Sequence, residues 1–219
     1  MKHKHEICPM QILLVSATAN EIELFTKNGS PVDLLIAGVG LPATLYHLQK
    51  RMQQIDYDLV IQAGIAGTFN TNIALGETVW VQQDCFGDLG TEEKGRFAPL
   101  FESGLADKNE FPFTDGWLTN SGKITNDLTL RAVRAVTVNK ITDSPLQQQQ
   151  LVEHFQPDIE SMEGAALHYV CLQEKVPFIQ LRAISNYVGE RDKSKWKMQE
   201  AITNLHNELL KLLNQQIRR

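Results

Sequence analysis

The sequence predicts an α/β protein whose mixed β-sheet is buried at the centre of a single domain. Apolar runs rich in strand-forming residues recur along the chain, and several lack the alternation of a half-exposed strand. Such runs are typical of strands buried on both faces of a sheet. Helical patterns separate some of the runs, and this order of elements indicates the α/β class. The length of 219 residues suffices for one well-filled core, and no repeat or domain boundary is visible, so residues 1–219 are expected to form one domain.

The individual elements follow from these patterns. Strands are expected at residues 12–17, 34–37, 59–63, 78–82, 135–138 and 178–184. Helices are expected at residues 41–55, at 163–174 and from Met198 onward, where apolar residues recur at three- and four-residue steps. The glutamines at 147–150, which follow Pro145, are expected to form the exposed opening turns of another helix. Residues 86–126 are polar and rich in glycine, so this long insertion is expected to serve in binding or oligomer contacts.

The composition argues against several classes of protein. A net charge of -5 disfavours a general nucleic-acid binder, which would carry a basic face. A small basic cluster is simplest to interpret as a solvated loop and helix start; it consists of Arg191, Lys193, Lys195 and Lys197. Three widely spaced cysteines form no disulfide or zinc pattern, so a reducing, cytoplasmic setting is expected. No apolar run approaches the length of a membrane span, and no metal-ligand cluster or cofactor motif is visible, so neither membrane contact nor a cofactor is expected.

The amino-terminal residues 1–10 are polar and lack the apolar centre of a signal peptide. They are expected to be flexible. His3 and His5 could contact a metal ion, but a frayed terminus is the simpler interpretation.

Two polar features follow predicted strands, at the strand ends where α/β sheets bind ligands. Glu21 comes shortly after the first strand, in the segment Thr18-Ala19-Asn20-Glu21. Its carboxylate either faces a ligand or completes a capping box with Thr18, and local sequence favours neither interpretation. The run Gly64-Ile65-Ala66-Gly67 follows the third strand and can present backbone N–H groups to a ligand. It contains neither a dinucleotide fingerprint nor a phosphate loop, and a tight turn would explain it as well.

Further polar features lie in the last third of the chain. Glu163 begins a predicted helix, where the dipole favours a carboxylate by roughly 0.3–1 kcal/mol, but it could also accept hydrogen bonds from a sugar diol. Met162 could pack on a sugar or fill the core. Asn186 follows Ser185 at the end of a strand, and its amide could pair with a purine or form a turn. Trp196 could cover a ligand or anchor the last helix.

The ordered set of these motifs resembles the nucleoside phosphorylase and nucleosidase superfamily, from the first strand through to the final helix. The set comprises Glu21, Gly64–Gly67, Met162-Glu163 and Arg182-Ala183-Ile184-Ser185-Asn186. Within the superfamily, the chain most resembles the futalosine hydrolases, which remove hypoxanthine from futalosine in a pathway of menaquinone biosynthesis. This likeness is carried by Ser161-Met162-Glu163-Gly164-Ala165-Ala166 and by Val188-Gly189-Glu190-Arg191-Asp192 with Trp196. The resemblance implies a three-layer α/β/α fold and a homo-oligomer, either a dimer or a tetramer.

The resemblance also implies the type of reaction. Phosphorylases of the superfamily hold phosphate with arginine and serine near the glycine-rich strand end, where this chain has Gln62 and Ile65. Glu21 aligns with the water-activating glutamate of the nucleosidases, so hydrolysis is expected rather than phosphorolysis. Glu163 is expected to hold the ribose hydroxyls.

The choice of base is implied by Asn186, because adenine-specific relatives such as methylthioadenosine nucleosidase have aspartate at this position. An asparagine can donate to a 6-oxo group and accept from a protonated N7, which suits hypoxanthine. Adenine would leave a donor facing a donor, at a cost of about 1–3 kcal/mol. The resemblance places Ile141 against the base. Arg191, or one of its lysine neighbours, is expected to bind the carboxylate at the benzoate end of futalosine, and Trp196 to cover the sugar or the aromatic ring.

Three other functions remain open. The first two are a purine nucleoside phosphorylase acting on inosine and a methylthioadenosine-type nucleosidase. The third is a nucleoside-binding protein that has kept the fold without the activity. The presence of both Glu21 and Glu163 argues against the third, since a binder does not require a water-activating base.

Overall fold

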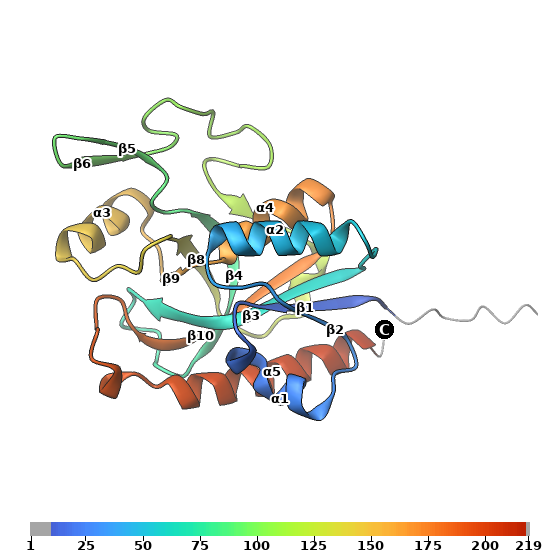
Figure 1. Ribbon diagram of the computed structural model, residues 1–219. Coiled ribbons are helices and arrows are strands. Elements are labelled where there is room, and N and C mark those ends of the chain that lie inside the picture. Colours follow the sequence, from blue (N-terminus) through green and yellow to red (C-terminus); the bar gives the residue numbers. More distant parts are fainter. Residues whose placement is uncertain (1–9, 218–219) are drawn as a thin grey trace, which may run out of the picture.

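A mixed sheet forms the centre of the protein, as the sequence predicts (Figure 1). The computed structural model describes residues 10–217, so His3, His5 and nearly all of the segment predicted to be flexible lie outside the described residues. The main sheet has eight strands. They are β1 (Ile12–Ser16), β2 (Asp33–Ile36), β3 (Leu59–Thr68), β4 (Thr78–Phe86), β7 (Leu118–Thr119), β8 (Ala132–Thr137), β9 (Ile159–Ser161) and β10 (Phe178–Tyr187).

Part of the sheet closes on itself around β3. The strand order is β10-β4-β8-β9-β3-β1-β2, and β10 also pairs with β3, so that β3, β10, β4, β8 and β9 form a ring. The amino-terminal half of β3 pairs with β1, whereas Gly67 and Thr68 at its other end pair with β9. The closed part has an apolar core of its own, built from residues such as Ala66, Val79 and Ile159. One strand thereby joins the open sheet to the ring.

Helices cover both faces of the open part of the sheet and give the three-layer architecture that the resemblance implies (Figure 1). Helix α5 (Met198–Ile217), together with η1 (Ala19–Ile22) and α1 (Glu23–Asn28), covers one face; α2 (Leu41–Met52) and α4 (Gly164–Glu174) cover the other. Alternate residues of β1 enter the two cores: Leu14 packs in the core containing Leu205 of α5, and Leu13 in the core containing Leu167 of α4. Burial of each leucine contributes about 1.5–3 kcal/mol.

Several elements differ in length from the sequence expectations. Strand β3 runs on through Gly64–Gly67 to Thr68, because β10 pairs with it along this whole length and offsets the weak strand preference of glycine. Strand β10 continues to Tyr187, past a bulge between Ile184 and Asn186. Helix α2 ends at Met52 rather than at residue 55. Helix α3 (Pro145–Phe155) begins where expected, although only Gln149 of its glutamine run is exposed.

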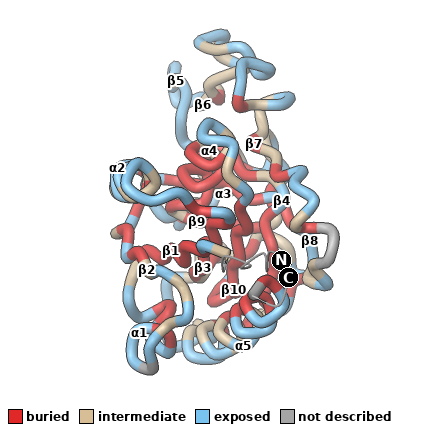
Figure 2. Tube along the Cα trace, turned by 90° about the vertical axis from the view of Figure 1, so that its right-hand side faces the viewer, coloured by how far each residue is buried: buried red, intermediate tan, exposed pale blue. Residues whose placement is uncertain are grey.

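The insertion at 86–126 contains more regular structure than expected. It holds a hairpin of β5 (Gly90–Glu93) and β6 (Arg96–Pro99), then β7, and the start of η2 (Lys123–Asp127). Lys94 and Gly95 between the hairpin strands both have positive φ, as a two-residue type I′ turn requires. The hairpin is largely exposed and projects from the body of the protein (Figure 2). An oligomer contact here stays a prediction.

The structure also bears on the cysteines and on the expectation of no membrane span. Cys85 and Cys171 are both buried free thiols. Across residues 10–217, no helix combines the length and apolar character that crossing a membrane needs.

Candidate active site

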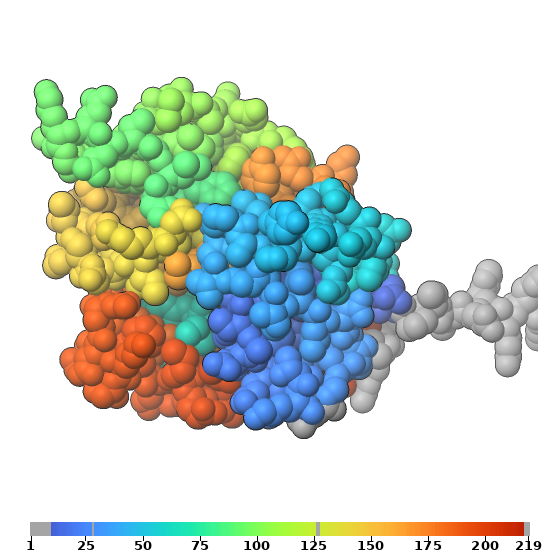
Figure 3. All heavy atoms as spheres, in the orientation of Figure 1, coloured from blue at the N-terminus to red at the C-terminus, as the bar shows by residue number. Residues whose placement is uncertain are grey.

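A cavity of about 380 Å³ opens beside the carboxyl ends of β1, β3 and β10, a size within the range of small-molecule sites. It forms a recess in the surface where part of β3 lies between segments from three other parts of the chain (Figure 3). All the predicted site residues except Gly64 line this cavity: Glu21, Ile65, Ala66, Gly67, Ile141, Met162, Glu163, Ser185, Asn186, Arg191 and Trp196. No residue of the 86–126 insertion lines it, so a binding role of that segment in this cavity is not supported.

Gly64 contributes by the space it leaves rather than by a contact with a ligand. A Cβ atom at this position would collide with Nη1 of Arg182 and lie 2.9 Å from Oε1 of Glu21. The absence of a side chain on β3 therefore allows a buried guanidinium and a carboxylate to approach the same point of the sheet.

Glu21 is held by four hydrogen bonds at the end of β1. Its Oε2 accepts from Ser16 Oγ, Thr18 N and Thr18 Oγ1, each at 3.0 Å, and its Oε1 accepts from Ile65 N at 3.1 Å. The bond from Thr18 N belongs to the capping box, and the same side chain lines the cavity, so the capping role does not exclude contact with a ligand. Each carboxylate oxygen carries two lone pairs, so Oε2, with three donors around it, is saturated, whereas Oε1 has one protein donor among the described residues. The side chain is thus fixed in place while one acceptor site remains for a small molecule.

Glu163 occupies the N-cap position of α4, but its side chain turns toward the cavity instead of capping the helix. Its Oε1 accepts from Gly40 N at 3.1 Å, and its Oε2 lies 3.4 Å from Nη1 of Arg182. Val39, next to that glycine, lines the cavity. The turn after β2 therefore helps to form the site.

Arg182 was not among the predicted site residues, although it contacts the Glu163 carboxylate from behind the cavity. It is 1% exposed, and its Nη2 donates to Gln62 Oε1 at 2.9 Å while its Nη1 faces Glu163. Burying an unpaired arginine would cost far more than burying one with such partners. The signal was present in the sequence, because a charged residue inside the apolar run 178–184 requires a buried partner.

The buried carboxyl group of Asp84 lies close to the first turn of α4. Asp84 is fully buried, and its Oδ1 accepts from Thr137 Oγ1 at 2.8 Å and from Cys85 N at 2.9 Å. Thr137 Oγ1 in turn accepts from the backbone N–H of Ala165 in the first turn of α4. Burial raises the pKa of Asp84 to about 7, although the hydrogen bond from Thr137 and the charge of Arg182 act against the shift.

Asn186 has a defined amide orientation. Its Nδ2 donates to the carbonyl oxygen of Tyr187 at 2.9 Å, and its Oδ1 accepts from Ser185 Oγ at 2.7 Å. A flipped amide would set its oxygen against that carbonyl, which cannot donate. One N–H and one acceptor site of the amide remain without a partner among the described residues.

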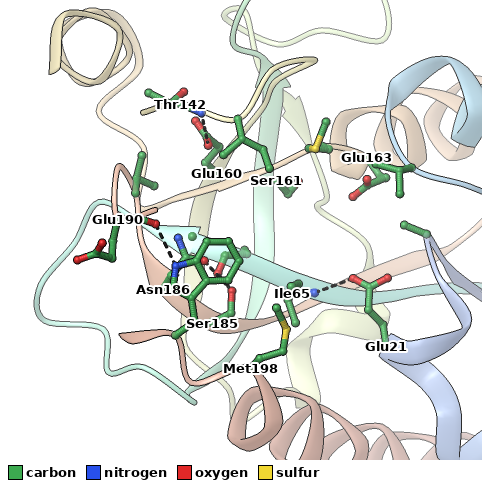
Figure 4. A pocket seen from close by; sticks show the side chains of 18 of the residues that line it. Glu21, Ile65, Thr142, Glu160, Ser161, Glu163, Ser185, Asn186, Glu190 and Met198 are labelled. Atoms are coloured by element: carbon green, nitrogen blue, oxygen red, sulfur yellow. Dashed lines mark hydrogen bonds between the residues drawn. The ribbon is translucent and has the colours of Figure 1, made fainter. Parts of the chain in front are cut away.

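Glu160 and Thr142 also line the cavity, and neither was among the predicted site residues. Glu160 lies in β9, and its Oε1 accepts from Thr142 N at 3.1 Å. Burial raises the pKa of this carboxyl, whereas hydrogen bonds from Thr142 oppose the shift. In Figure 4, the carboxylates of Glu21 and Glu163 lie toward one end of the cavity, and Glu160 and Asn186 lie toward the other.

The rim of the cavity is formed by the loop between β10 and α5. Trp196 Nε1 donates to the carbonyl of Glu190 at 3.0 Å, and the guanidinium of Arg191 lies 5.9 Å from the centre of the indole ring. Lys195 forms an ion pair with Glu190 at 2.7 Å, and neither it nor Lys193 lines the cavity. Of the three cationic residues considered for a carboxylate, only Arg191 is therefore placed at the cavity.

Within the part of the chain that the structure describes, no group of three or more histidine, cysteine, aspartate or glutamate side chains is arranged to hold a metal ion.

The fold and the cavity define a protein of the nucleoside phosphorylase and nucleosidase class. The family model described as "Phosphorylase superfamily" matches residues 12–214. A futalosine hydrolase of Thermus thermophilus is 33% identical over 155 residues, which cover 68% of this chain and 67% of that protein. The chain belongs to the phosphorylase superfamily, and its relatives place it among the N-glycosyl hydrolases of that superfamily.

Solved structures show the same fold. A 5′-methylthioadenosine/S-adenosylhomocysteine nucleosidase from Colwellia psychrerythraea, in complex with adenine, matches with a TM-score of 0.78 and 17% identity, over 96% of each chain. Native futalosine hydrolase of Helicobacter pylori matches with a TM-score of 0.75 and 15% identity, over 94% of this chain and 98% of that one.

Proposed function

We propose that this protein hydrolyses the N-ribosidic bond of futalosine, releasing hypoxanthine and dehypoxanthine futalosine as a step of menaquinone biosynthesis. The observation that carries the proposal is the division of the cavity: two carboxylates at one end and an oriented amide at the other. Support for futalosine comes from the relative of Thermus thermophilus. Nucleosidases named for methylthioadenosine and S-adenosylhomocysteine are also similar to this chain, at up to 26% identity. These two compounds are therefore the alternative substrates.

In the proposed mechanism, Glu21 orients and deprotonates a water molecule that attacks C1′ of the ribosyl group. The free acceptor site on its Oε1 is where the water would bind. Positive charge develops on the sugar as the bond to the base breaks, and the Glu163 carboxylate would stabilise this charge while it holds the ribose hydroxyls. The electron pair of the broken bond passes into the purine, which takes up a proton from solvent at N7, and Glu21 releases to solvent the proton that it removed from the water.

Asn186 would stabilise the departing hypoxanthine. Its oxygen accepts from the protonated N7, and its remaining N–H donates to the 6-oxo group. An adenine would present its 6-amino donor to the same N–H. The hydrogen bonds to Ser185 and Tyr187 hold the amide against the rotation that would relieve this conflict.

Hydrolysis is favoured over phosphorolysis by the surroundings of the arginine in the site. Both terminal nitrogens of Arg182 have partners, Gln62 on one side and Glu163 on the other, and the side chain is buried. A phosphate bound there would compete with the Glu163 carboxylate and be repelled by it.

The proposal is tested by measuring the release of free base in phosphate-free buffer, with futalosine, its 6-amino analogue, methylthioadenosine and inosine as substrates. We expect rapid release of hypoxanthine from futalosine alone. Release of adenine would overturn the assignment of the base, and cleavage that begins only when phosphate is added would identify a phosphorylase. No cleavage of any of the four would identify a nucleoside-binding protein.

The role of Glu21 is tested by Glu21→Gln, which is expected to lower kcat by about 10²- to 10⁴-fold with little change in the binding of substrate. The matched control is Glu23→Gln, the same substitution two residues away at an exposed position paired with Lys27. Near-normal turnover of Glu21→Gln would remove the residue from the mechanism.

A further inference from the structure

Besides Glu21 and Glu163, a further carboxylate that takes no part in the proposed reaction lies at the base end of the cavity. Glu160 is 6% exposed and lines the cavity. Its Oε1 accepts from Thr142 N, but its Oε2 is buried without a hydrogen-bond partner among the described residues. A buried oxygen left unpaired costs about 1–3 kcal/mol, more when it is charged, so such groups in native proteins call for an explanation. A ligand that brings a hydrogen-bond donor would supply the missing partner.

The strand register places this carboxylate opposite Asn186. Gly67 of β3 is the pairing partner of Glu160 on one side and of Asn186 on the other. Residues paired across neighbouring strands project from the same face of a sheet. A Cβ atom added to Gly67 would lie 3.3 Å from Asn186 Nδ2, which agrees with a shared face.

Because Gly67 has no side chain, a slot remains between the two residues, and Val188 borders it with its Cγ2 3.1 Å from where a Cβ of Gly67 would lie. Neighbouring strands lie about 4.8 Å apart, so the Cα atoms of Glu160 and Asn186 are separated by two strand spacings, or roughly 10 Å. No side chain from Gly67 rises between them. A slot bounded by a carboxylate on one wall and an amide on the other can take a flat heterocycle that has polar groups on two edges.

The two walls select for different hydrogen-bonding patterns. An ionised carboxylate only accepts, so the edge of the ring that faces Oε2 must carry an N–H. The pyrimidine ring of a 6-oxopurine has such a donor at N1, whereas N1 of a 6-aminopurine is an acceptor. The nearby backbone donor that could serve an acceptor, Thr142 N, is already bound to Glu160 Oε1.

We propose that Glu160 is a specificity-determining residue: its Oε2 accepts the N1–H of a 6-oxopurine while Asn186 contacts the other edge of the ring. This inference rests on the proposed function in that the cavity must take a purine nucleoside. It assigns the choice between 6-oxo and 6-amino bases to two residues on separate strands, not to Asn186 alone.

The test is the Glu160→Gln variant, with free hypoxanthine and free adenine as probes in titration calorimetry. The glutamine oxygen can keep the bond from Thr142 N, so its NH2 group replaces Oε2 and faces the base as a donor. The affinity for hypoxanthine is expected to fall by about 10- to 100-fold, while that for adenine stays constant or rises. Glu160→Asp keeps the charge and should keep the preference for hypoxanthine. The matched control is Glu153→Gln on the exposed side of α3, which should leave both affinities unchanged.

A purely structural role of Glu160 would weaken both bases together, so the ratio of the two affinities is the decisive quantity. A wild-type protein without a preference for hypoxanthine, or a ratio that Glu160→Gln leaves unchanged, overturns the proposal. Because free bases report on recognition without turnover, the outcome is independent of the proposed reaction. If Glu160→Gln inverts the ratio of the two affinities but the wild type does not cleave futalosine, the role of Glu160 stands and the proposed reaction fails. If the wild type cleaves futalosine but the substitution leaves the ratio unchanged, only the role of Glu160 fails.

Discussion

Replacing Asp84 by asparagine is expected to change how the stability of the protein depends on pH. The side chain is fully buried behind α4, and burial raises its pKa from 3.8 to about 7. Asparagine has nearly the same shape and can still accept the bonds from Thr137 Oγ1 and Cys85 N. The substitution therefore removes the titration while it retains the packing.

The sign of the effect follows from the raised pKa. As the pH rises above 3.8, the unfolded chain releases the proton of this carboxyl, whereas the folded protein holds it until the pH reaches about 7. The folded state binds more protons in this window, so the free energy of unfolding falls as the pH rises. The difference between the two pKa values corresponds to on the order of 4 kcal/mol, of which about 2–3 kcal/mol is lost between about pH 5 and pH 8.

The assay is urea denaturation of both proteins at several pH values and matched protein concentration. His168 titrates in the opposite sense, because burial lowers its pKa to about 4 and stability is lost as the pH falls from 6.5 toward that value. Both proteins contain this histidine, so its contribution cancels in the difference between them. The Asp84→Asn variant should gain about 2–3 kcal/mol relative to the wild type on going from about pH 5 to pH 8. A difference that is constant with pH, or that has the opposite slope, would refute the reasoning.

Two further predictions concern the cavity. Gly64→Ala places a methyl group against Arg182 and Glu21, so we expect a loss of about 1–3 kcal/mol in the free energy of unfolding together with a lower kcat. Urea denaturation and steady-state kinetics would measure both effects, with Gly122→Ala as a control, where the nearest atom is 3.3 Å away; normal kinetics of Gly64→Ala would contradict the prediction. Arg191→Ala should raise KM for futalosine by about 2- to 5-fold, because an exposed ion pair with the substrate carboxylate would be lost. The same change in KM for inosine, which has no carboxylate, or an equal effect of Lys193→Ala, would remove Arg191 from that role.

Much of the fold could be predicted because its signals are local. The runs at 12–17 and 59–63 are continuous and apolar, and strands buried on both faces have this pattern. The final helix shows its apolar face over several turns, so Met198 was located as its start. Most of the site could be predicted for a related reason, since residues placed after strand ends converge at one edge of an α/β sheet.

What could not be predicted depends on pairing between distant segments. Strand β9 has three residues, too few for any periodicity, yet it closes the ring of strands and gives Glu160 its position. The hairpin in the insertion was missed because its strands are polar and exposed. Glycines usually interrupt strands, so the continuation of β3 through Gly64–Gly67 needs the partner β10, which is more than a hundred residues away in the sequence.

The continuation of β3 also fixes the distance between the two ends of the cavity. Ile65 N–H binds Glu21, the proposed base for the attacking water, and Gly67 lies between Glu160 and Asn186, the proposed walls of the base slot. Two residues of a strand span roughly 7 Å, so reaction centre and base slot are held at a set separation by one piece of backbone. That backbone is paired on both sides, with β10 along its length and with β9 at its end. In the proposed complex, the sheet itself would therefore align a base in the slot with Glu21.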